Sequence, residues 1–255
     1  MAFIPNTRGG YQGAFVDAAV IDAGLRAYML RVYNWMASGL ALTGIVATWI
    51  GNSSAINLFY HPVVTAYGTR LAPTGLAYLV MFAPLAFVLV LSFGVQRLST
   101  TAAQALFWAF CATMGASLAN IFLVYTGASI ANAFFITAGT FGAMSIYGYT
   151  TKTDLTRFGS FLMMALFGLI IAMVVNMFLH SSGMQFIISI AGVLIFVGLT
   201  AYDTQRIKAD FISYAGSYSP DVAAKRGVYD ALSLYLNFIN LFLMILRLTG
   251  SQRQN

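Results

Sequence analysis

Long apolar runs, separated by short polar segments, restrict this chain to a small set of folds. An α-helix rises 1.5 Å per residue, so it needs roughly 20 apolar residues to cross a hydrocarbon layer about 30 Å thick. The strands of a membrane β-barrel would instead show stretches of about ten residues that alternate in polarity. The sequence therefore predicts an all-α polytopic membrane protein, a bundle of seven transmembrane helices at about 28–50, 76–96, 102–125, 129–149, 159–180, 185–203 and 229–248.

The composition agrees with this fold class. The chain is 60% hydrophobic and 8% charged, whereas a soluble domain is roughly 25% charged. This much apolar surface does not fit into one globular core, so the lipid bilayer is the expected partner. We interpret the net charge of +6 as a signal of membrane topology rather than of nucleic-acid binding. The sequence contains neither a Gly-rich phosphate loop nor a zinc motif, and we expect no enzyme and no cofactor.

The basic residues predict how the chain is oriented. If the N-terminus lies in the cytoplasm, ten of the 13 basic residues lie on that side: Arg8, Arg26, Arg31, Arg97, Lys152, Arg157, Arg206, Lys208, Lys225 and Arg226. Such an excess is typical of cytoplasmic segments. We expect a cytoplasmic N-terminal arm over 1–27, a transmembrane domain over 28–250, and a short tail over 251–255 outside the membrane.

Three charged side chains stand out in a sequence with seven acidic residues and no glutamate. Asp203 ends the sixth predicted span, Asp230 begins the seventh, and Arg97 ends the second. In the predicted orientation all three lie at the cytoplasmic face. Carboxylates at the edge of the hydrocarbon layer are costly and are usually retained for handling ions or protons.

A polar stripe follows the last predicted span. Asp230, Ser233, Asn237 and Asn240 are spaced so that they share one face of a helix. A polar stripe is unfavourable against lipid, so we expect it to face the interior of the bundle.

Two chemical roles suit these groups. Neighbouring carboxylates repel each other, so such a pair takes up a proton and responds to pH. When ionised, Asp203 is also a possible oxygen ligand for Ca²⁺, and Arg97 can compete with the cation for the carboxylate as a latch. The alternatives are structural: Asp203 pairs with Arg206 or caps a helix, Asp230 favours a helix N-terminus, and Arg97 anchors the chain at the cytoplasmic face.

The run GLTAYDTQRIK at 198–208 resembles the signature of the transmembrane Bax inhibitor motif family, also called the Bax inhibitor-1 family. Further similar stretches lie at 115–155, 158–178 and 231–248, the last reading ALSLYLNFINLFLMILRL. The resemblance implies a bundle of seven spans with the seventh at its centre, and a pH-sensitive cation leak, chiefly of Ca²⁺.

The same resemblance implies roles for single residues. In the family, two aspartates on the last two helices sense pH, and an arginine at the end of the second helix latches them. The first aspartate corresponds to Asp203, and the arginine is similar in position to Arg97. The second falls within LYLDF, where this chain has Asn237. Asparagine forms hydrogen bonds but does not ionise. Asp230, about 10 Å nearer the cytoplasm by helical rise, is an alternative second carboxylate.

Three functions remain open at this stage. The first is a cation leak channel or transporter in a bacterial inner membrane. The second is an adaptor that regulates other membrane proteins in stress or quality control, a role that the resemblance also implies. The third, an intramembrane aspartyl protease using Asp203 and Asp230, is disfavoured because the expected Gly-x-Gly-Asp pattern is absent before Asp230.

Overall fold

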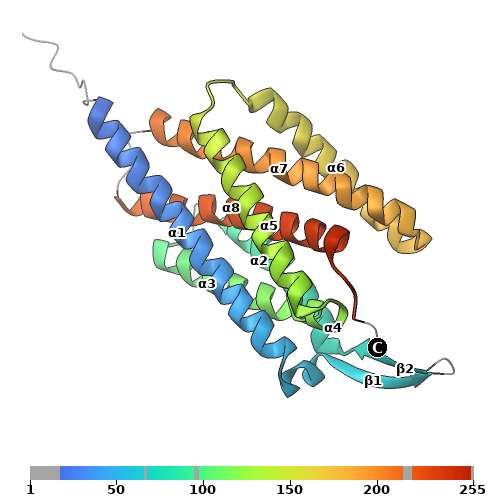
Figure 1. Ribbon diagram of the computed structural model, residues 1–255. Helices are drawn as coiled ribbons and strands as arrows, with labels where there is room; N and C mark the ends of the chain where they lie inside the picture. Colours follow the sequence, from blue (N-terminus) through green and yellow to red (C-terminus); the bar gives the residue numbers. More distant parts are fainter. Residues whose placement is uncertain (1–17, 66–67, 95–97, 215–219, 254–255) are drawn as a thin grey trace, which may run out of the picture.

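The structure, a computed structural model, describes residues 18–65, 68–94, 98–214 and 220–253. Its helices and strands in chain order are α1 (Ala18–Gly51), the 3₁₀ helix η1 (Ser54–Leu58), β1 (Tyr60–Thr65), β2 (Gly68–Pro73), α2 (Gly75–Gly94), α3 (Thr100–Leu118), α4 (Ile121–Val124), α5 (Gly127–Thr150), α6 (Thr156–Leu179), α7 (Ser182–Ser213) and α8 (Pro220–Thr249). Figure 1 shows the start of α1 and the β1–β2 hairpin at opposite ends of the bundle.

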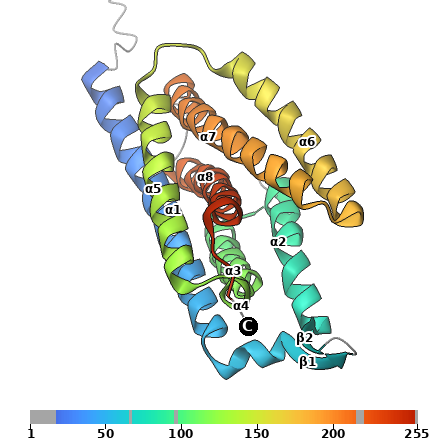
Figure 2. The same ribbon diagram turned by 45° about the vertical axis from the view of Figure 1, so that its right-hand side comes forward.

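Helix α8 lies at the centre of the bundle. It packs against α7, α1, α5 and α3, and Figure 2 shows these helices around it. About 67% of the most apolar 18-residue stretch of α8 is buried, against 11% for the corresponding stretch of α6, which lies at the edge of the bundle. This arrangement agrees with the central position expected for the last transmembrane helix.

Five helices in the described part of the chain are long and apolar enough to cross a membrane: Thr100–Val124, Gly127–Thr150, Thr156–Leu179, Ser182–Ser213 and Asp221–Thr249. Gly75–Leu91 in α2 is a shorter apolar helix. Helix α1 is not among the five, and its first half carries Asp22, Arg26 and Arg31. The all-α membrane class is therefore supported, and five of the seven predicted spans meet this standard of length and composition.

Several helices continue beyond the predicted apolar runs. Helix α7 extends to Ser213, and α8 begins at Pro220, so Asp203 and Asp230 both lie inside helices rather than at helix ends. The suggestions that Asp203 caps a helix and that Asp230 marks a helix N-terminus are therefore wrong. A helix does not have to stop where hydropathy falls, because its polar side chains can pair: Arg226 of α8 forms an ion pair with Asp210 of α7, with an N···O distance of 2.6 Å.

The segment between α1 and α2, which lies between the first two predicted spans, contains a hairpin. Strands β1 and β2 pair antiparallel, with Tyr60 opposite Pro73 and Thr65 opposite Gly68. This hairpin was not predicted from the sequence.

The residues that follow α8 pair with the junction between α4 and α5. The amide of Arg253 donates to the carbonyl of Val124 at 2.9 Å, and the amide of Thr126 donates to the carbonyl of Ser251 at 3.2 Å. An isolated β-bridge joins Tyr125 and Gln252. Residues 251–253 are thus an ordered part of the fold.

Candidate functional site

Asp203 lies where α7 packs against α8, and only 7% of its surface is exposed. Its Oδ2 atom accepts hydrogen bonds from Ser233 Oγ at 2.9 Å and from Asn237 Nδ2 at 2.7 Å. Residues four apart share a helix face, so α8 presents both donors to one oxygen. The predicted polar stripe therefore faces the bundle interior at these two positions.

Arg206 supplies the positive charge beside this carboxylate. One guanidinium nitrogen lies 3.0 Å from Asp203 Oδ1 and also donates to Ser233 Oγ at 3.3 Å. The Arg206 side chain is 41% exposed, so it reaches from the buried carboxylate toward the surface. The pairing of Asp203 with Arg206, one of the structural alternatives above, is thus present. We call Asp203, Arg206, Ser233 and Asn237 the Asp203 cluster.

Two close contacts with neighbouring helices fix the position of α7 just before Asp203. A Cβ atom added at Gly148 of α5 would collide with the carbonyl oxygen of Ala201, and one added at Gly159 of α6 would collide with the ring of Tyr202. Ala201 and Tyr202 immediately precede Asp203. Because glycine carries no side chain, α5 and α6 approach α7 closely at these points.

Two further polar residues of the 198–208 motif connect α7 to the end of α5 and to the segment between α5 and α6. Gln205 Oε1 accepts from the amide of Leu155 at 2.8 Å, and its Nε2 donates to the carbonyl of Thr153 at 2.7 Å. Lys208 Nζ donates to the carbonyl of Tyr149 at 2.8 Å. Sequence reasoning missed these roles, although the motif contained both residues.

Asp230 has a different set of neighbours. It is 8% exposed, and its Oδ2 accepts a hydrogen bond of 2.5 Å from the hydroxyl of Tyr28 on α1. The Tyr28 ring stacks on Phe211 of α7, with ring centroids 5.0 Å apart. Among the described residues no hydrogen bond joins Asp230 to Asp203. Among the described residues, Asn237 is thus hydrogen-bonded to Asp203 and Asp230 is not.

Two predicted site residues remain, Arg97 and Asn240. Arg97 falls outside the described residues, so the latch assigned to it stays a prediction. Asn240 is half-buried on α8. No hydrogen bond of its side chain is found in the part of the chain that the structure describes.

A second group of polar side chains lies in the core beside α8. Tyr235 is fully buried, and its hydroxyl lies 2.6 Å from Thr43 Oγ1. The Thr43 hydroxyl in turn donates to the carbonyl of Cys111 at 2.9 Å. These contacts join α8 to α1 and α3. The spacing of residues along one helix does not predict these contacts, because the partners come from distant parts of the sequence.

The donor set limits what the Asp203 cluster can bind. Within the described residues there is no group of three or more His, Cys, Asp or Glu side chains that could hold a metal ion. A Ca²⁺ ion at Asp203 would therefore depend on one carboxylate together with neutral oxygens such as those of Ser233 and Asn237.

The sequence that forms this site matches a known protein family. The model of the family described as "Inhibitor of apoptosis-promoting Bax1" matches residues 25–254. The chain belongs to the Bax inhibitor-1 family. The match includes the whole Asp203 cluster and confirms the resemblance seen in the 198–208 motif.

Bacterial relatives are similar over nearly their whole length. The inner membrane protein YbhL of Escherichia coli strain K12 is 45% identical over 231 residues, 91% of this chain and 94% of YbhL. Uncharacterised proteins of Rickettsia prowazekii (44% over 232 residues; 91% and 92%) and Caulobacter vibrioides (45% over 235 residues; 92% of each chain) are similar. None of these descriptions names an activity.

Proposed function

We propose that this protein is a pH-sensitive cation leak channel or transporter, with Ca²⁺ as the favoured ion. The observation that carries the proposal is the buried Asp203 carboxylate, held by Ser233 and Asn237 of the central helix α8 and by Arg206. Ionisable groups within membrane bundles are costly, and those that are retained commonly mark ion or proton pathways. In this proposal the protein carries out no catalysis and needs no cofactor.

In this proposal pH acts through the carboxylates of the last two helices, Asp203 and Asp230, and Asp203 is the one that joins α7 to α8. The ionised carboxylate holds Arg206 of α7 and two donors of α8 at one point of contact between the helices. Protonation removes the charge that attracts Arg206 and converts an acceptor into a donor. Arg206 thus acts as a local latch. Tyr33 of α1 faces the same turn, with its hydroxyl 3.5 Å from Thr204 Oγ1.

The proposal also includes the topology. Seven spans, formed by α1, α2, α3 with α4, α5, α6, α7 and α8, cross a bacterial inner membrane with the N-terminus in the cytoplasm and the C-terminus outside. YbhL, described as an inner membrane protein, and the excess of basic residues on one side support this arrangement. Tags fused to the two ends should be labelled from opposite sides of the membrane. Labelling from one side would contradict it.

The proposal is tested by flux into proteoliposomes that contain the purified full chain. Entry of Ca²⁺ and of K⁺ is compared between about pH 5 and pH 8, for wild type, Asp203→Asn and Asn237→Asp. We expect wild type to leak Ca²⁺, Asp203→Asn to change the leak and its pH dependence, and Asn237→Asp to sharpen the pH response by adding a second carboxylate.

The matched control is Asp154→Asn. Asp154 is an exposed carboxylate in the loop before α6, and hydrogen bonds from Thr156 lower its pKa, so it stays ionised throughout the assay. This variant should behave as wild type. Absence of flux at every pH would overturn the transport proposal and favour the adaptor, which predicts a cellular phenotype that survives loss of Asp203 and a partner recoverable in detergent.

A further inference from the structure

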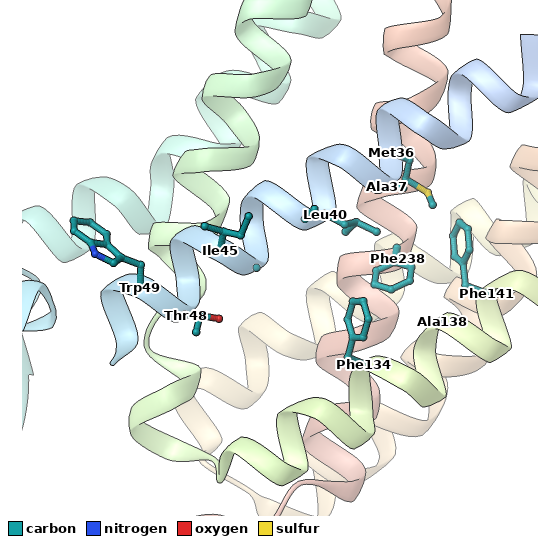
Figure 3. A pocket seen from close by; sticks show the side chains of 12 residues that line it. Met36, Ala37, Leu40, Ile45, Thr48, Trp49, Phe134, Ala138, Phe141 and Phe238 are labelled. Carbon is teal, nitrogen blue, oxygen red and sulfur yellow. The ribbon is translucent and has the colours of Figure 1, made fainter. Parts of the chain in front are cut away.

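A long groove runs between α1 and α5, with Phe238 of α8 as part of its floor. Three adjoining cavities make it up, with volumes of about 850, 550 and 360 Å³. The two largest share Met36 and Phe141, and the largest and smallest share Leu40, Phe134 and Phe238 among others. Figure 3 shows the rings of Phe134, Phe141 and Phe238 facing the α1 side chains in the largest cavity.

The groove is apolar and open at the side. Its lining includes Ile45, which is 67% exposed, Trp49, which is 66% exposed, and Phe134, which is 43% exposed. From Arg26 to Trp49 the α1 wall is about 34 Å long by helical rise, close to the hydrocarbon thickness. A Cβ atom added at Gly44 in this wall, or at Gly142 in the opposite wall on α5, would meet no other atom within 4 Å. The groove therefore has room for a chain-like apolar ligand.

One end of the groove is polar and positively charged. Arg26, exposed on α1, lines the 550 Å³ cavity, and no ion pair of its guanidinium is found among the described residues. Asp22, one turn earlier, is the acidic side chain nearest to it along α1. Tyr149 lines the same cavity, and the Lys208 ammonium lies 4.9 Å from the centre of its ring.

A buried hydroxyl at this end lacks a partner. Ser145 of α5 lines the same cavity as Arg26 and is only 6% exposed. Its Oγ atom has no hydrogen-bond partner within the described part of the chain. A buried polar group is normally satisfied by protein, water or a ligand. An ester or glycerol oxygen in the cavity would supply the missing partner.

We propose that this groove is a binding site for an anionic phospholipid of the surrounding bilayer. The phosphate lies at Arg26, the ester region lies at Ser145, and one acyl chain follows Phe141 and Phe134 over Phe238. A transmembrane helix of another protein would also cover the apolar wall, but it does not supply a negative charge at Arg26 together with an ester oxygen at Ser145. The proposal concerns binding and does not depend on ion transport.

Native mass spectrometry of the full chain in detergent tests this site. Phosphatidylglycerol and phosphatidylcholine with identical acyl chains are added separately at equal concentration. We expect wild type to retain phosphatidylglycerol about fivefold more, because a basic residue near the surface contributes about 1 kcal/mol with anionic lipid and 1.4 kcal/mol is tenfold. Arg26→Gln should abolish the preference. Gly142→Leu, which fills the cavity, should reduce retention of phosphatidylglycerol at least as much.

The matched control for the filling variant is Gly139→Leu. Gly139 lies on the same helix, also has open space around an added Cβ atom, and lines none of the three cavities. It should retain lipid as wild type does. Should Gly142→Leu fail to fold, Gly44→Leu fills the neighbouring cavity in its place. Equal retention of the two lipids by wild type, or unchanged retention after filling the groove, would overturn the proposal.

Discussion

Asp203 and Asp230 are buried to nearly the same degree, 7% and 8% exposed, but their surroundings differ. Asp203 accepts two hydrogen bonds from α8 and pairs with Arg206 on its own helix. Asp230 accepts its hydrogen bond from Tyr28 of α1, while Arg226, one turn earlier on α8, pairs with Asp210. One carboxylate therefore holds α7 to α8, and the other holds α1 to α8. The degree of burial does not distinguish these two roles. The side chains that surround each carboxylate do.

The largest effect is expected from removing the first carboxylate. Asp203→Leu leaves Asn237, Ser233 and Arg206 without their shared acceptor, so we expect the free energy of unfolding to fall by about 3 kcal/mol. Asp230→Leu removes the acceptor of one hydrogen bond and should cost about half as much. Thermal unfolding in detergent measures both. Equal losses would mean that the two carboxylates are not structurally distinct.

A smaller effect is expected at the Asp230 contact. Tyr28→Phe removes the hydroxyl but keeps the ring stacked on Phe211, so the loss should be about 1.5 kcal/mol. Tyr33→Phe is the matched control, because its hydroxyl makes only a 3.5 Å contact with Thr204. The same unfolding assay applies. If the control lost as much stability, the hydrogen bond to Asp230 would not be what holds α1.

The smallest effect on stability is expected from Arg206→Gln. This side chain is 41% exposed, and water and salt screen such pairs, so the cost should stay below about 1 kcal/mol and shrink in high salt. Unfolding at low and high ionic strength measures it. Arg247→Gln, an exposed position near the other end of α8, should show no salt-dependent loss. A large loss that salt does not alter would place Arg206 in the core rather than at its edge.

The sequence predicted those parts of the site that depend on one helix. The spacing of Ser233 and Asn237 indicated a shared face, and both side chains contact Asp203. The apolar runs likewise indicated membrane helices, because hydropathy over about twenty residues is a strong local signal. Helix ends were predicted less well, since α7 and α8 continue through polar residues that pair with each other, as Asp210 and Arg226 do.

Contacts between distant segments were not accessible from the sequence. Tyr28 and Asp230 are 202 residues apart, and nothing in the spacing along either helix indicates that they meet. Gln205 was visible in the family motif, but its bonds to Leu155 and Thr153 depend on how the segment before α6 turns. Such pairings are fixed by the three-dimensional arrangement of helices rather than by local pattern.

The pairing of residues 251–253 with the junction between α4 and α5 implies an order of assembly. Tyr125 and its neighbours leave the ribosome long before Gln252, and α5 through α8 lie between them in the chain. Contacts between segments so far apart in sequence form late, because the intervening chain must be ordered first. The junction at which α5 begins is therefore completed only after the central helix α8 has entered the bundle.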